Sequence, residues 1–199
     1  DCAHIHEQDP SKRSGLYSTM VPGMRTSVIT YCDMDNNKEG GGWTVIQRRQ
    51  TDDSFEKVWN EYKHGFGNPM GTFWWGNEKV HQLTKQKPYH LRVEVQNAAG
   101  SKRVAVYEDF KLEDEDSKYT LRVGKYSGTA GDALMTHNGK NPSGEQAWGD
   151  SNGVGFSAND KDNDGSKTSE CGKQYQSGWW FNQFCPNPAN LNGKSTTLS

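Results

Sequence analysis

Apolar and polar residues alternate along several short stretches in the first part of the chain, and this pattern predicts β-strands. In segment 43–49, every second residue from Trp43 to Gln47 shares one face, which is the period of two that a strand requires. An earlier strand is predicted over 28–32, with turn-forming Asn and Gly residues between the two. Three further strands, expected to form an antiparallel sheet with one buried face, are predicted over 91–95, 104–107 and 119–123.

Apolar residues recur at helical spacing in two short places. Phe55, Val58, Trp59 and Tyr62 follow a capping sequence that begins at Asp53, and the glycines at 65 and 67 are candidate stops. A second short helix is predicted from Asn77 to Thr84. We interpret both as packing helices and not as carriers of an active site.

From Gly124 onward the regular periodicity disappears, and Gly, Asn, Asp and Ser dominate through Gly155. A long loop-rich region inside a compact domain commonly carries function. We therefore predict that the functional surface lies in the last third of the sequence. The acidic run 113–116, between two predicted strands, is interpreted as a solvated turn.

The composition is that of one loop-rich domain. At 199 residues with 11% aromatic residues the protein is able to bury one good-sized core, yet only 31% of its residues are hydrophobic and 22 are glycine. The net charge of −2 argues against a nucleic-acid partner, because such proteins neutralise phosphates with clustered Lys and Arg. No apolar run approaches the roughly 20 residues that a membrane-spanning helix needs. The first residues do not resemble a signal peptide, so we expect a mature or excised module.

Four cysteines stand at positions 2, 32, 171 and 185, without the spacing of a zinc site. Three disulfide connectivities are compatible with the sequence, and the local one closes two modest loops. An even cysteine count in a sequence rich in Gly and Trp favours an oxidising compartment and hence secretion. The alternative is a cytosolic protein with four free thiols, and no Asn-x-Ser/Thr sequon adds support for secretion.

Asp160, Asp162 and Asp164 crowd within one short segment and repel one another unless a cation offsets their charge. Oxygen ligands at alternate positions suit Ca²⁺, which takes roughly 6–8 of them. An EF-hand loop would need a bidentate Glu where this sequence has Cys171, and the flanks are poor helix formers, so we reject an EF-hand. We predict a calcium-stiffened recognition loop, against the alternative of a solvated acidic loop without an ion.

Catalytic signatures are absent from the sequence. It contains no Gly-x-Ser-x-Gly elbow, P-loop, dinucleotide-binding fingerprint or His-Glu-x-x-His motif. A terminal histidine pair such as His4-x-His6 usually binds no metal. We therefore predict that the protein is not an enzyme.

A set of specific motifs runs in order through nearly the whole sequence. They include Tyr31-Cys32-Asp33-Met34, the run from Gly41 to Arg49, the run from Phe73 to Glu78, the run from Tyr126 to Asp132, Trp179-Trp180 and Leu191-Asn192-Gly193. Together they resemble the fibrinogen C-terminal-like domain, a family that includes the fibrinogens, ficolins, tachylectins and angiopoietins. The resemblance implies an α+β fold as a single domain over 1–199. Its subdomains would be a small amino-terminal sheet unit over about 1–49, a central twisted antiparallel sheet with short helices over 50–123, and a loop-rich calcium-binding subdomain over 124–199.

The resemblance also implies two disulfides and one set of ion ligands. The disulfides are Cys2–Cys32 and Cys171–Cys185. Ca²⁺ would be held by the side chains of Asp162 and Asp164 and by the backbone carbonyls of Ser166 and Thr168, with Asp160 as an outer partner.

In the acetyl-binding lectins of this family, the ligand pocket lies beside the second cysteine of the later pair. Here Tyr175 matches the pocket aromatic, but the position of the family's His is Pro186, which has no N–H donor. One extra residue within 183–184 lengthens the loop, and family members continue beyond the segment that matches 191–193, so we expect a differently lined pocket. The predicted ligand-binding residues are Tyr175, Phe184, Cys185, Pro186 and Asn187.

The function that the resemblance implies is a secreted, calcium-stabilised pattern-recognition lectin of innate immunity that binds acetylated or other microbial surface carbohydrates. The alternative is an extracellular protein–protein recognition module, such as a receptor ligand or an adhesive or clotting-type domain, and the Pro186 departure favours it. We interpret Trp179 and Trp180 as core residues in preference to ligand contacts. Weak single-site sugar binding needs multivalency, and we expect any oligomerising segment to lie outside this sequence.

Overall fold

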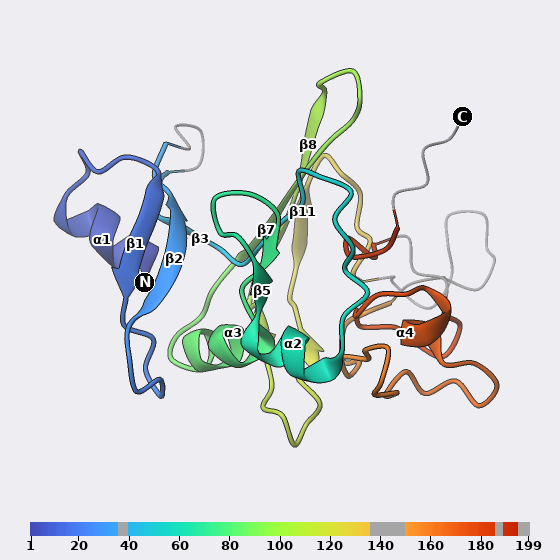
Figure 1. Cartoon of the computed structure of the whole chain (residues 1–199). Coiled ribbons are helices and arrows are strands. Elements are labelled where there is room, and N and C mark those ends of the chain that lie inside the picture. The colour runs from blue at the N-terminus through green and yellow to red at the C-terminus, as the bar shows by residue number, and fades with distance from the viewer. Residues whose placement is uncertain (36–39, 136–149, 186–188, 195–199) are drawn as a thin grey trace. The chain divides into compact units, whose positions relative to one another are not determined.

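The computed structural model describes residues 1–35, 40–135, 150–185 and 189–194 (Figure 1). These residues form an α+β, sheet-rich fold in which the helices are short and every strand pair of the described part is antiparallel. The protein separates into two compact units. Unit 1 comprises Asp1–Asp53 and Asn60–Leu83, and unit 2 comprises Ser54–Trp59 and Thr84–Ser199. The division into three subdomains remains a prediction.

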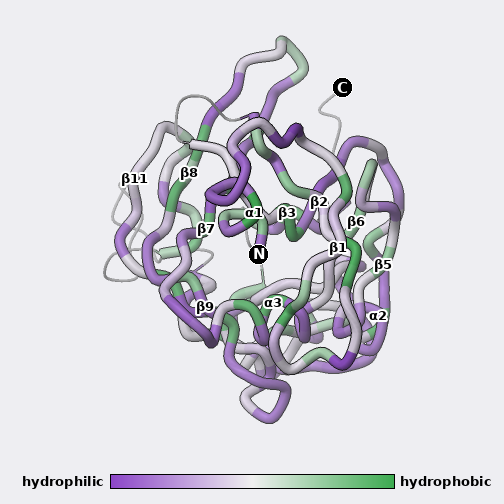
Figure 2. The backbone as a smooth tube through the Cα atoms, turned by 90° about the vertical axis from the view of Figure 1, so that its left-hand side faces the viewer, coloured by the Kyte–Doolittle hydropathy of each residue, from purple (hydrophilic) through white to green (hydrophobic). Residues whose placement is uncertain are grey.

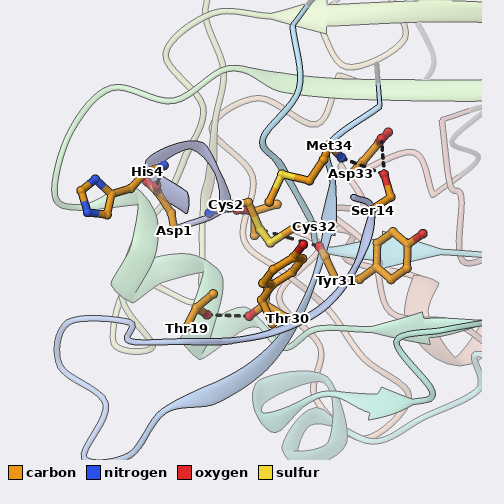
Figure 3. Close-up of a disulfide and its surroundings, with 12 residues drawn as sticks. Asp1, Cys2, His4, Ser14, Thr19, Thr30, Tyr31, Cys32, Asp33 and Met34 are labelled. Carbon is orange, nitrogen blue, oxygen red and sulfur yellow. Dashed lines mark hydrogen bonds between the residues drawn. A yellow bond between two sulfur atoms is a disulfide. The ribbon is translucent and has the colours of Figure 1, made fainter. Parts of the chain in front are cut away.

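A disulfide and a short helix order the first sheet of unit 1. Strands β1 (Gly15–Thr19), β2 (Val28–Asp33) and β3 (Trp43–Val45) lie in the order β1-β2-β3, and α1 spans Cys2–Gln8. The Cys2–Cys32 disulfide joins α1 to β2 and is fully buried beside Met34 (Figure 3). The Asp1 carboxylate accepts the His4 N–H at 3.0 Å and so caps α1. The sequence pattern indicates neither α1 nor β1, because both are short and weakly periodic.

The second sheet of unit 1 has the order β4-β6-β5, formed by Gln47–Arg48, Phe73–Trp74 and Phe66–Gly67. The strand predicted over 43–49 is divided at Ile46, whose carbonyl accepts the Trp75 N–H at 2.8 Å. Helix α3 spans Asn77–Thr84, as the sequence predicts. Helix α2 spans Trp59–His64 and does not begin near Asp53. The Thr51 hydroxyl donates to the Asp53 carboxylate at 2.5 Å, and this local turn competes with a helical cap there.

Unit 2 contains a three-stranded sheet of order β11-β8-β7, formed by Tyr126–Gly128, Lys102–Tyr107 and Leu91–Gln96. Figure 2 shows short hydrophobic segments, as on β8, separated by hydrophilic connections. The segment predicted as a third strand over 119–123 does not join this sheet. Only Leu121–Arg122 (β10) is a strand, and it pairs with Lys111–Leu112 (β9) because Tyr119 turns the backbone at φ 47°. None of the helices in the described part of the protein is both long and apolar enough to span a membrane.

Tyr107, at the end of β8, connects the sheet to the loop-rich part of unit 2. Its buried hydroxyl accepts the N–H groups of Ala133 and Leu134 at 3.1 and 3.3 Å, and lies 3.1 Å from the Asp132 carboxylate, to which it donates. Burial raises the pKa of Tyr107 to about 12 from its ordinary value of 10.0. The neutral hydroxyl therefore holds residues 132–134 against the sheet.

We expect Tyr107→Phe to lower the free energy of unfolding by about 1–3 kcal/mol, because two backbone N–H groups lose their acceptor. The pKa of Tyr107 is raised in the fold, so its contribution is complete below pH 10 and is lost as the pH rises towards about 12. Urea denaturation of the wild type and the variant should show a stability difference that shrinks across this interval. A difference that stays constant from neutral pH to pH 12 would contradict this role.

Candidate functional site

Short hydrogen bonds fold the segment from Asp160 to Cys171 around one buried carboxylate. Asp164 is 3% exposed, and its two carboxylate oxygens accept the N–H groups of Ser166 and Cys171, each at 2.7 Å. The N–H of Asp164 donates to the Asp162 carboxylate at 3.1 Å. Gly165 turns the backbone at φ 74°, a conformation that glycine adopts without steric cost. The loop thus brings Asp162 and Asp164 together.

The electrostatics of this loop fit a hard cation. Burial raises the pKa of Asp164, and the neighbouring Asp162 carboxylate raises it further. Within the described residues, Asp164 forms no ion pair with a cationic side chain. The backbone carbonyl oxygens of Ser166 and Thr168 accept no hydrogen bond from that part of the protein either. Two crowded carboxylates and two unengaged carbonyls are the ligand types that Ca²⁺ takes, so the residues present fit this ion.

Asp164 also lies beside the second disulfide. One of its carboxylate oxygens and the sulfur atoms of Cys171 and Cys185 are within 4.8 Å of one another. A Cys-rich metal site is excluded here, because the two sulfurs form a disulfide and offer no thiolate ligand. The disulfide joins helix α4 (Cys171–Gln174) to Cys185 with a Cα–Cα distance of 5.0 Å. The buried carboxylate is therefore one hydrogen bond away from the cystine that holds the later loop.

Asp160 makes a tertiary hydrogen bond to α2, and its role as an outer ion partner remains a prediction. Its carboxylate accepts the N–H of Trp59, the first residue of α2, at 2.6 Å. The ammonium of Lys161 lies 4.0 Å from the Trp59 ring centroid, and the Trp59 indole N–H donates to Glu115 at 2.8 Å. Trp59 thus anchors both the start of the acidic loop and the run 113–116, which is not merely a solvated turn.

The tryptophan pair belongs to the core of unit 2. Trp179 and Trp180 are 4% and 5% exposed and meet edge to face at 5.1 Å. The indole N–H of Trp180 donates to the Tyr119 carbonyl at 2.8 Å, and Trp179 exchanges two backbone hydrogen bonds with Ser157. The core interpretation of this pair is confirmed by its burial.

The predicted ligand-binding residues that the structure describes gather around the second disulfide. The Tyr175 ring follows α4 and stacks on Phe181 with centroids 5.9 Å apart, while Phe184 is 42% exposed. Cys185 has a φ of 62°, a strained conformation for a residue with a side chain, and its N–H donates to the Asn182 carbonyl at 3.1 Å. That N–H is engaged within its own loop. The other two predicted residues, Pro186 and Asn187, lie outside the described residues.

Two asparagines that carry no predicted role position the last described segment. Asn192 is 1% exposed and its side-chain amide donates to the Gly178 carbonyl at 2.9 Å. The Asn190 amide donates to the Ser177 hydroxyl, also at 2.9 Å. These bonds hold residues 189–193 beside the aromatic block. The Leu191-Asn192-Gly193 motif is visible in the sequence, but the partners of its side chains are not.

Beside the acidic loop lies an open cavity of about 590 Å³ that the sequence does not indicate. Residues 162 and 166–170 line it from the loop, and Lys173 and Gln174 line it from α4. All of its lining residues are polar.

The protein matches the family model for the C-terminal globular domain of the fibrinogen β and γ chains over residues 1–198. Fibrinogen-like protein 1 of Rattus norvegicus is 42% identical over 197 residues, which is 97% of this chain and 60% of that protein. Techylectin-5A of Tachypleus tridentatus is 42% identical over 199 residues, which is 97% of this chain and 61% of that protein. The sequence thus spans about 60% of the length of these curated relatives.

Solved structures agree with this match. The fibrinogen-like globe domain of human ANGPTL2 has a TM-score of 0.84 at 34% identity, and the match extends over 98% of this chain and 81% of that one. Lamprey fibrin D-dimer, complexed with the peptide ligand Gly-His-Arg-Pro-amide, has a TM-score of 0.86 at 34% identity, over 99% of this chain and 61% of that one.

Proposed function

Because the protein belongs to the family of fibrinogen β and γ C-terminal globular domains, which are non-enzymatic recognition modules, we propose that it is a calcium-stabilised lectin. In this proposal it is secreted and recognises acetylated or other microbial surface carbohydrates in innate immunity. Two buried disulfides support an oxidising, extracellular location. The similarity to Techylectin-5A, a lectin by its name, supports the carbohydrate ligand.

One connected set of contacts carries the proposal. The Asp164 carboxylate accepts the Cys171 N–H, and the Cys171–Cys185 disulfide fixes the loop in which Cys185 is strained. Backbone strain of this kind persists only where the surrounding structure holds it, and it concentrates at binding sites. A cation on the acidic loop therefore acts on the ligand loop through one hydrogen bond and one disulfide.

The residues of the proposed site have separate tasks. The carboxylates of Asp162 and Asp164 and the carbonyls of Ser166 and Thr168 would hold Ca²⁺, which supplies the positive charge that offsets their repulsion. The half-buried ring of Tyr175 would offer an apolar face to the methyl group of an acetylated sugar. Phe184 and Cys185, with Pro186 and Asn187 after them, would form the rest of the contact. Useful avidity would come from multivalency supplied outside this sequence.

The proposal is tested by retention on immobilised N-acetylglucosamine, on acetylated beads and on whole bacteria. We expect retention in calcium, with elution by a chelator or by free acetylated sugar. Bacteria treated with periodate, which cleaves surface sugars at vicinal hydroxyls, should lose the binding that terminal sugars provide, whereas protease treatment should leave binding intact. Failure to be retained on any of these surfaces in calcium would refute the lectin function.

Protein recognition is the second candidate, and the exposed Phe184 ring favours it. Aromatic side chains that are exposed in the free protein are frequent anchors of protein interfaces. The similarity to a structure complexed with a peptide, and to a protein named Angiopoietin-4 in Bos taurus, agrees with this interpretation. Under it, protease treatment of the target surface abolishes binding and periodate treatment does not.

A further inference from the structure

The cavity beside the acidic loop has more space than a bound ion needs. Its volume is about 590 Å³, whereas a water molecule takes about 30 Å³ of liquid volume. An ion with a few waters would therefore leave most of the cavity unfilled. Sites for small molecules have volumes of roughly 300–1,000 Å³. The cavity is open to solvent, so one or two sugar rings would rest in it with one side exposed, and its lining does not include Tyr175 or Cys185.

Exposed polar side chains line the open cavity, and several of them have no partner within the described protein. The ammonium of Lys173 is 3.1 Å from the Glu170 carboxylate, so those two charges offset each other. Lys167, by contrast, forms no ion pair or hydrogen bond with its side chain among the described residues. The Thr168 hydroxyl and the Gln174 amide also have no hydrogen-bond partner in that part of the protein. The Lys167 ammonium and two neutral polar groups, the Thr168 hydroxyl and the Gln174 amide, therefore line the same cavity.

The charge of this space depends on the acidic loop. Asp162 lines the cavity and its carboxylate neighbours the buried Asp164. Without a cation, these two carboxylates outweigh the surplus charge of Lys167 and repel an anion. A divalent cation on both of them offsets their charge and leaves Lys167 as the dominant charge. Calcium therefore converts the cavity from one that repels anions to one that attracts them.

We infer that this cavity is a second ligand site, which takes a saccharide bearing an anionic group in a calcium-dependent manner. The inference rests on the proposed calcium site but not on the proposed acetyl-binding surface. The Lys167 ammonium pairs with the carboxylate or sulfate of the sugar. The Gln174 amide and the Thr168 hydroxyl bond to its ring hydroxyls.

The test uses anionic sugars that carry no acetyl group, so that the surface around Tyr175 does not contribute. Methyl glucuronide and galactose 6-sulfate represent the two sources of negative charge, and methyl glucoside is the neutral control. Binding is followed by NMR chemical-shift titration of the wild type at saturating calcium and in chelator. The matched variants are Lys167→Gln and, outside the cavity, the exposed Lys125→Gln.

We expect at least one anionic sugar to bind in calcium and not in chelator, with methyl glucoside binding far more weakly. Lys167→Gln should weaken the anionic sugar roughly tenfold, the loss of one charged contact, and Lys125→Gln should leave it unchanged. Glu170→Gln should strengthen binding, since it releases Lys173. Equal affinity in chelator, equal affinity for the neutral sugar, or an unaffected Lys167→Gln would each overturn the inference. Calorimetry with calcium alone distinguishes failure of the proposed calcium site from failure of this inference. If calcium binds and neither anionic sugar does, only this inference fails.

Discussion

Replacing Asp164 with Ala should lower the free energy of unfolding by about 2 kcal/mol without calcium and by about 5 kcal/mol at calcium concentrations about 100-fold above its Kd. The loss of stability expected without calcium reflects the N–H groups of Ser166 and Cys171, which lose their acceptor. Relief of repulsion from Asp162 offsets part of this cost. The increment in calcium, about 2.7 kcal/mol, is the ligand stabilisation that the variant no longer receives.

Asp164→Asn separates the contribution of the hydrogen bonds to stability from the contribution of bound calcium. The amide keeps one acceptor oxygen for a backbone N–H but loses the charge that the ion needs. We expect its stability in chelator to lie between those of Asp164→Ala and the wild type, because one of the two N–H groups keeps its acceptor and repulsion from Asp162 is removed. Thermal or urea denaturation in calcium and in chelator measures both variants. Stabilisation of Asp164→Asn by calcium to the same extent as the wild type would show that the ion does not bind at this loop.

Removing the second disulfide should be the other large effect. The double variant Cys171→Ser/Cys185→Ser releases a loop with a sequence separation of 14, which corresponds to about 3 kcal/mol of stability in the loop-entropy account. It also frees the strained backbone at Cys185 and the Cys171 N–H that contacts Asp164. Denaturation should therefore show the loss of stability, and both calcium affinity and ligand retention should fall in the variant under conditions where it still folds.

The first disulfide provides the matched control. Cys2→Ser/Cys32→Ser also removes a buried cystine, with a sequence separation of 30, so its cost in stability should be comparable or somewhat larger. Cys2 and Cys32 belong to unit 1, whereas the acidic loop belongs to unit 2, and we expect calcium affinity and retention to remain at wild-type levels. If the two double variants lost ligand binding to the same extent, the second disulfide would have no special role in the site.

Strands and helices with a clear local period were predictable. The segments 28–32 and 91–95 lie within β2 and β7, and α3 has the predicted bounds. These elements were predictable because the apolar residues of their buried face recur at a regular spacing along the local sequence. The start of α2 was not predictable. Its first N–H is capped by Asp160, which is 101 residues away in the sequence, so no local capping sequence marks the helix start. β10 likewise pairs with β9 and not with the sheet that its alternation suggests.

In the candidate site, too, local sequence patterns reveal local features but not tertiary contacts. Crowded carboxylates at Asp162 and Asp164 are visible in the sequence, because like charges at alternate positions are a local feature. The hydrogen bond of Asp160 depends on the distant Trp59, and the role of Asn192 depends on the Gly178 carbonyl. The cavity walls combine the loop with α4, a helix of four residues without an amphipathic pattern. Such features arise from tertiary contacts and are not encoded in any single stretch.

Calcium titration by calorimetry of Asp162→Asn and Asp160→Asn tests the central claim most directly. Both variants remove one carboxylate charge from the same loop, and each keeps an acceptor oxygen for its hydrogen bond to the Asp164 or Trp59 N–H. We predict that Asp162→Asn weakens calcium binding by at least tenfold, the loss of one ligand charge, while Asp160→Asn binds with nearly wild-type affinity. Wild-type calcium binding by Asp162→Asn, or its loss in Asp160→Asn alone, would contradict the proposed ion site.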